Sequence, residues 1–151
     1  MISSVYIFED LDAEEKKTVE GLLKSRECTA GEEVYREGEP GGTLNIVESG
    51  RVSINKTMVE GDQYCMASLR QGEVFGVLSF LDRSRHDATI SAEENTKILV
   101  FEREAFDRLM CEQPMIAAKM LRRIALHLSS IVKSMNSQQR DLMHMMFRKS
   151  K

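Results

Sequence analysis

Three histidines, several serines and a few acidic pairs are the side chains of this sequence that could form a metal site or a catalytic centre. His86, His127 and His144 lie too far apart to match the HxxxH or HExxH spacing of zinc ligands on a helix. Ser79 and Ser84 lie outside any GxSxG segment, the usual context of a nucleophilic serine in α/β-hydrolases. The acidic pairs stand in a helix start or beside turns, where solvated carboxylates are expected: Glu14-Glu15, Glu32-Glu33 and Glu93-Glu94. We therefore expect no catalytic residues, no metal site and no enzyme activity, and His86 is the one candidate pH-responsive group.

The composition and net charge indicate which binding partners and which cellular compartment to expect. The formal net charge is −3 and the pI is near 5.7, so the chain lacks the basic surplus that binds nucleic-acid phosphates. No apolar run approaches the roughly 18–20 residues that span a bilayer, and the start MISSVYIFED lacks the basic and apolar segments of a signal peptide. Three separated cysteines, Cys28, Cys65 and Cys111, favour a reducing compartment. We expect a cytoplasmic protein with no nucleic-acid partner and no membrane partner.

Short apolar runs separated by glycine-bearing turns fill the middle of the chain. Ahead of them, Asp12 followed by Glu15 is typical of a capped helix start and predicts a short helix over 12–24. The runs that are typical of strands are Glu33–Tyr35, Leu44–Val47, Val52–Ile54, Cys65–Leu69 and Ile98–Phe101. Glycine supplies the positive φ that tight reversals between strands need. Seven or eight short strands at this spacing predict a sandwich or barrel.

Two helices are expected after the strands. The first covers Arg103–Glu112, and the second begins at Pro114, because proline suits the first position of a helix. The second helix repeats apolar residues in alternating steps of three and four, as the a/d seam of a coiled coil does, with one glutamine as a polar interruption. The members of this seam are Leu121, Ile124, Leu128, Ile131, Met135, Gln138, Leu142 and Met145. The pattern predicts a homodimer, in which residues 114–151 are the dimerisation helix of a single domain and residues 1–113 its β-rich part.

Through several motifs that follow one another along the chain, the sequence resembles the cyclic-nucleotide-binding domain family, which includes the regulatory domains of catabolite activator proteins. The segments that carry the resemblance are Gly38-Glu39 with Leu44–Val52, then Leu69–Gly76, and finally Ala88-Thr89. The resemblance covers nearly everything from Phe8 to about Met145 and implies a mainly β fold with flanking α-helices. That fold is a double-stranded β-helix, or jelly-roll-like β-roll, between a short N-terminal helix and a long C-terminal dimerisation helix. The activator proteins continue into a helix-turn-helix beyond the point where this sequence stops, so no DNA-reading module is expected.

In that family the segment after a Phe-Gly pair forms a phosphate-binding cassette, a short helix whose N-terminal amides face the cyclic phosphate, with a Glu and an Arg completing the site. The resemblance implies these cassette positions here: Phe75, Gly76, Val77, Leu78, Ser79, Arg85, His86, Asp87, Ala88 and Thr89. Val77 replaces the Glu that accepts from the ribose hydroxyl, His86 replaces the phosphate-binding Arg, and Asp87 adds a negative charge. We therefore expect cyclic AMP and cyclic GMP to bind weakly or not at all, unless Arg83 or Arg85 supplies the missing guanidinium.

Two functions are compatible with this sequence. The first is a regulatory module that senses a small ligand in the roll and signals through the dimer helix. Its candidate ligands are a cyclic nucleotide or another small anion. The alternative is a ligand-free dimer that serves as a protein-interaction scaffold. In that case its apolar end would bind a partner protein through Met143, Met145, Met146 and Phe147.

Overall fold

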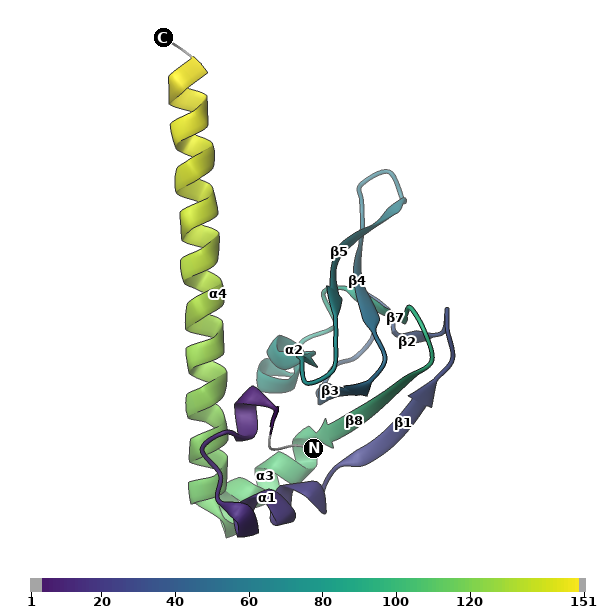
Figure 1. The fold of residues 1–151 in the computed structure, drawn as a ribbon, viewed down its shortest axis with the longest axis vertical. Helices are drawn as coiled ribbons and strands as arrows, with labels where there is room; N and C mark the ends of the chain where they lie inside the picture. Colours follow the sequence, from purple (N-terminus) through teal and green to yellow (C-terminus); the bar gives the residue numbers. More distant parts are fainter. Residues whose placement is uncertain (1–3, 150–151) are drawn as a thin grey trace.

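The computed structural model describes residues 4–149 and shows a β-roll flanked by helices (Figure 1). Its helices are η2 (Tyr6–Phe8), α1 (Ala13–Glu20), α2 (Val77–Asp82), α3 (Arg103–Glu112) and α4 (Pro114–Lys149). Its strands are β1 (Lys24–Cys28), β2 (Glu33–Tyr35), β3 (Thr43–Ser49), β4 (Val52–Thr57), β5 (Gln63–Leu69), β6 (Val74–Phe75), β7 (Thr89–Ala92) and β8 (Thr96–Glu102). Within the described residues, these eight strands form two four-stranded antiparallel sheets, ordered β1-β8-β3-β6 and β2-β7-β4-β5. The predicted mainly β fold with flanking helices is confirmed.

Helix α1 starts as predicted and ends earlier than predicted. The Asp12 carboxylate accepts a hydrogen bond from the Glu15 amide at 2.8 Å, and the Glu15 carboxylate accepts one from the Asp12 amide at 3.0 Å. This reciprocal cap fixes the first turn. The predicted end at residue 24 was wrong, because Lys24 already pairs with Val100 of β8. The helix ends at Glu20 with Gly21 as its C-cap, and β1 begins at Lys24.

Two apolar cores hold the roll and the helices together. The first lies within the roll and is built mostly from branched aliphatic side chains of both sheets, including Val47, Val52, Ile90 and Ile98, together with the ring of Phe75. The second packs the helices against β3 and β8, and contains three mutually contacting rings, Phe80, Phe101 and Phe106. Because α2 contributes Phe80 to this second core, the position of α2 depends on α3 and α4.

Helix α4 begins at Pro114, where the sequence predicted a helix start, and extends well beyond the roll (Figure 1). Its first turns are anchored by buried apolar residues: Ile116, Ala117, Met120 and Ile124. Arg123 pairs with Asp10 at 2.6 Å and lies over the Tyr6 ring at 5.3 Å, which ties the N-terminal segment to the helix. Over residues 4–149 no helix is long and apolar enough to cross a membrane.

Candidate functional site

A cavity of about 280 Å³ opens between the roll, α2 and the middle of α4. Apolar side chains such as Ile54, Val77, Leu128 and Ile131 form most of its wall, and a few polar groups are placed among them. A mainly apolar cavity with a few polar groups is typical of small-molecule sites in proteins. Eight of the ten predicted cassette residues line it: Phe75, Gly76, Val77, Leu78, Ser79, His86, Asp87 and Ala88.

Gly76 sets the start of α2 at the edge of this cavity. Its φ is +80°, a backbone conformation that favours glycine. A Cβ atom at this position would lie 2.9 Å from the side-chain nitrogen Nδ2 of Asn45 and 2.9 Å from the backbone carbonyl oxygen of Thr43. Glycine is therefore required both for the turn and for the close approach to β3. The turn places Val77 first in α2, where its side chain is almost fully buried and lines the cavity.

His86 is a buried polar side chain of the cavity with two defined contacts. Its ring stacks on Tyr35 with centroids 3.5 Å apart and planes only 6° from parallel, and its Nδ1 lies 3.3 Å from Ser79 Oγ. Burial lowers the pKa of His86 below its ordinary value, although the carboxylates of Glu39 and Asp87 oppose this effect. A histidine whose pKa lies below about 6.5 is predominantly neutral at pH 7, so the ring supplies no positive charge comparable to that of an arginine.

The two arginines that could have replaced the missing guanidinium lie outside the lining. Arg83 ends α2 with a φ of +59° and pairs with Asp107 of α3 at 2.9 Å. Arg85 donates a hydrogen bond to the Gly38 carbonyl at 2.8 Å and is exposed. Among the predicted cassette residues, Arg85 is thus held on the adjacent loop and is not brought together with the others.

Thr89, at the start of β7, is the second predicted cassette residue outside the lining. Its side-chain oxygen accepts a hydrogen bond from the Glu37 amide at 3.0 Å, so it fixes the loop that precedes the cassette. The same loop is held by the His86 amide, which donates to the Glu39 carbonyl at 2.9 Å, and by the Gly38 amide, which donates to the His86 carbonyl at 2.8 Å. Thr89 therefore has a positioning role.

Several lining residues come from elements that the sequence motifs did not indicate. Tyr35 from β2, Lys56 from β4, Met66 from β5 and His127 from α4 all reach the cavity. Tyr35 and Met66 lie in predicted strands and His127 was considered as a candidate metal ligand, but no sequence signal assigned any of the four to this cavity. These residues are separated from the cassette along the chain, and only the closure of the roll and the packing of α4 bring them to it.

The periodic face of α4 changes its environment along the helix. Ile124 is only 2% exposed and belongs to the core of its own chain, and Leu121 is half-buried against the same core. Leu128 and Ile131 line the cavity. The remaining members of the expected seam are exposed: Met135, Gln138, Leu142 and Met145. The surface that a second copy can contact therefore excludes Ile124.

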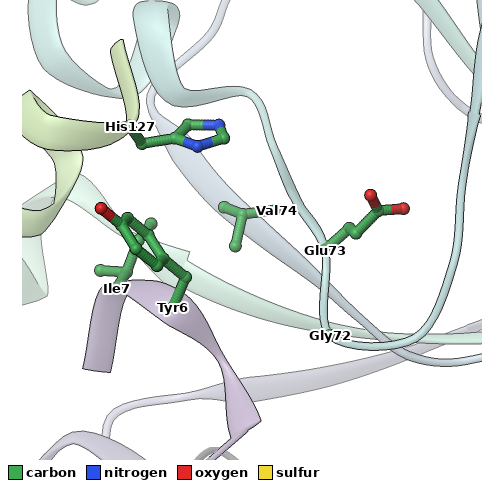
Figure 2. Close-up of a pocket in the computed structure, with 6 residues that line it drawn as sticks. All are labelled: Tyr6, Ile7, Gly72, Glu73, Val74 and His127. Atoms are coloured by element: carbon green, nitrogen blue, oxygen red, sulfur yellow. The ribbon is translucent and has the colours of Figure 1, made fainter. Parts of the chain in front are cut away.

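A smaller cavity of about 140 Å³ lies next to the main one (Figure 2). Figure 2 shows Tyr6, Ile7 and His127 facing Val74 across its opening. Val74 and His127 line both cavities, so the two share a wall. The N-terminal segment, held to α4 through Arg123, is thus adjacent to the main cavity.

The arrangement of roll, short helix and long helix agrees with the comparison with known families. A family model described as the cyclic nucleotide-binding domain matches residues 25–113, more than half of the chain. The chain belongs to this family. Its matched region includes all of the predicted cassette and ends just before α4.

The relatives that the chain matches include a cyclic AMP receptor protein and a regulatory subunit of a cAMP-dependent protein kinase. The chain is 31% identical to the cyclic AMP receptor protein of Thermus thermophilus over 74% of its own length and 51% of that protein. It is 30% identical to a cAMP-dependent protein kinase regulatory subunit of Yarrowia lipolytica over 72% of its length and 28% of that protein. The crystal structure of Thermus thermophilus catabolite activator protein aligns with a TM-score of 0.76 at 27% identity, covering 88% of this chain and 62% of that one. The chain thus spans about half or less of the length of these two relatives.

Proposed function

We propose that this chain is a regulatory module that binds a small ligand in the cavity and transmits its binding through α4. The observation that carries the proposal is that Leu128 and Ile131 of α4 form part of the cavity wall together with the cassette residues. An occupant therefore contacts the roll and the long helix at once. A ligand shifts a conformational equilibrium only through such differential contacts.

We infer further that cyclic AMP and cyclic GMP bind this cavity weakly. In the family, a Glu and an Arg complete the phosphate cassette, and Val77 and His86 stand at these positions. Val77 offers no hydrogen-bond acceptor, and the buried His86 ring is neutral at pH 7. Asp87 adds a carboxylate to the wall that an anion would have to approach. These three features support a ligand range that differs from that of the named relatives.

The signal is proposed to pass through a homodimer formed by the outer part of α4. Met135 and Leu142 are each 61% exposed, and they continue the same helix face that is buried against the roll nearer the N-terminus. An apolar stripe at a/d spacing is typical of coiled-coil pairing, and a single glutamine such as Gln138 can fix the register at a cost in stability.

A thermal-shift screen of small molecules tests this proposal. The set should contain cyclic AMP, cyclic GMP, other small anions and neutral compounds, because a ligand at 100 times its Kd stabilises the protein by about 2.7 kcal/mol. We expect at least one compound to raise the Tm, and Ile131→Ala to weaken its effect. Val132→Ala is the matched control, because Val132 is the exposed neighbour outside the lining. A screen without any stabilising compound, or a shift that Ile131→Ala leaves unchanged, would contradict ligand sensing through α4.

A ligand-free interaction scaffold is the second candidate function. One observation favours it: the end of α4 presents four exposed apolar side chains, Met143, Met145, Met146 and Phe147. Methionine-rich surfaces adapt to partner helices. Persistence of the dimer together with a negative screen would favour this candidate over the first.

A further inference from the structure

We infer that the cavity selects an uncharged, mainly apolar ligand that donates a hydrogen bond, and that it discriminates against anions. This inference rests on the proposed ligand-binding function and specifies the chemical class of the ligand. It follows from the hydrogen-bonding state of His86 and from the position of Asp87.

The contacts of Ser79 determine which nitrogen of His86 carries the proton. The Ser79 hydroxyl donates to the Gly76 carbonyl at 3.2 Å, and its oxygen lies 3.3 Å from His86 Nδ1. A hydroxyl has one proton, so a hydroxyl that donates to Gly76 can only accept from the ring. With the Ser79 hydroxyl turned toward Gly76, we assign the proton of the neutral His86 ring to Nδ1, which leaves a lone pair on Nε2. At this position a family arginine would offer only donors, whereas the neutral histidine offers an acceptor.

The charges around the cavity do not favour an anionic ligand. Asp87 is exposed, lines the cavity, and acts electrostatically on both His86 and Tyr35. Burial is the main cause that raises the pKa of Tyr35, so its phenol also stays neutral. Lys56 is the single lysine or arginine of the described lining. Its charge offsets that of Asp87, and an anion therefore meets no net positive charge.

The wall adds a second reason for an uncharged ligand. Most of the surface is contributed by aliphatic and aromatic side chains, among them Ile54, Phe75 and Leu128. A charged ligand would lose its hydration on entering such a cavity, and this loss is large unless a paired charge replaces the water. A neutral ligand with an N–H or O–H group can donate a hydrogen bond to His86 or Asp87, and its uncharged body can pack against the apolar wall.

Two probes of nearly equal shape test the inference: indole-3-acetamide, which is neutral and has an additional amide N–H donor, and indole-3-acetate, which is an anion; both carry the same indole N–H. Their binding to the full chain is followed by titration in ¹H–¹⁵N NMR spectra, with the amides of Ser79 and His86 as reporters. We expect the amide to bind at least about tenfold more tightly, the factor that one added hydrogen bond to a charged or desolvated group provides. Asp87→Asn should reduce this ratio. Glu104→Gln, which neutralises an exposed acid on α3 outside the lining, should leave it unchanged.

The ¹⁵N shifts of the His86 ring provide an independent readout that needs no ligand. Protonation on Nε2 in the free protein would overturn the inference while leaving the proposed ligand sensing intact, as would tighter binding of the acetate. If neither probe shifts any amide of the cavity, both the inference and the proposed function lose their support.

Discussion

The triple change Val77→Glu, His86→Arg and Asp87→Ala should convert the cavity into a cyclic AMP site. All three residues line the same cavity, so the new side chains would face one ligand. Val77→Glu supplies an acceptor at the start of α2, and His86→Arg supplies a charge that is permanent at any physiological pH. The new guanidinium can keep the stacking contact on Tyr35, because guanidinium planes also stack on aromatic rings. Asp87→Ala removes the opposing carboxylate.

The expected gain follows from the contacts that are restored. Each hydrogen bond to a charged group contributes about 1.5–3 kcal/mol, so two such contacts give roughly 3–6 kcal/mol, or two to four powers of ten in affinity. Val77 and His86 are nearly buried in the wild type, at 9% and 7% exposure. The introduced charges are therefore costly without ligand. We expect the free triple variant to have a lower Tm than the wild type, and to gain more stability on addition of cyclic AMP.

Isothermal titration calorimetry of the wild type and the triple variant at pH 7.5 measures the difference in their Kd for cyclic AMP. The wild type should bind cyclic AMP with a Kd of about 0.1 mM or weaker, and the triple variant in the micromolar range. Arg85→Ala is the control, because Arg85 contacts the Gly38 carbonyl outside the cavity and its loss should change neither affinity greatly. Micromolar, pH-independent binding by the wild type would refute the reasoning. A folded triple variant with no gain in affinity would also refute it.

Three further outcomes are expected. The double change Met135→Glu and Leu142→Glu places like charges on the exposed face of α4, and we expect this variant to sediment as a monomer at about tens of micromolar, a concentration at which we expect the wild type to sediment as a dimer. A wild-type monomer would contradict the proposed dimer. Met120→Ala should lower the free energy of unfolding by about 2–5 kcal/mol in urea titrations, because Met120 is fully buried, and a loss below about 1 kcal/mol would contradict its place in the core. Burial holds the pKa of His86 in the folded chain below its unfolded value near 6.5, so the unfolded chain binds more protons and stability falls as the pH drops through about 6.5. His86→Gln should make this loss smaller between pH 7.5 and 5.5, and an unchanged loss would show that other groups cause it.

Local patterns in the sequence were sufficient for most of the fold. The reciprocal cap at Asp12 and Glu15, the helix over Arg103–Glu112 and the new start at Pro114 were all predicted and are all present, because each depends on residues only a few positions apart. Strand β1 was missed for a physical reason. It is an edge strand with four exposed residues out of five, so it shows no apolar alternation, and only its pairing with β8 makes it a strand.

The tertiary structure decided which partner each predicted face meets. The repeat of apolar residues in steps of three and four identified one apolar face of α4, but such a repeat does not specify which segment packs against that face. The packing of the helix assigns Ile124 to its own core, Ile131 to the cavity and Met135 to the solvent. Likewise, the cassette motif showed that His86 stands where the family has an arginine, whereas the charge state of its ring depends on burial in the folded roll and its tautomer on the contact with Ser79. Sequence spacing determines helix faces and turns, whereas charge state and cavity lining depend on contacts between segments that are distant along the chain.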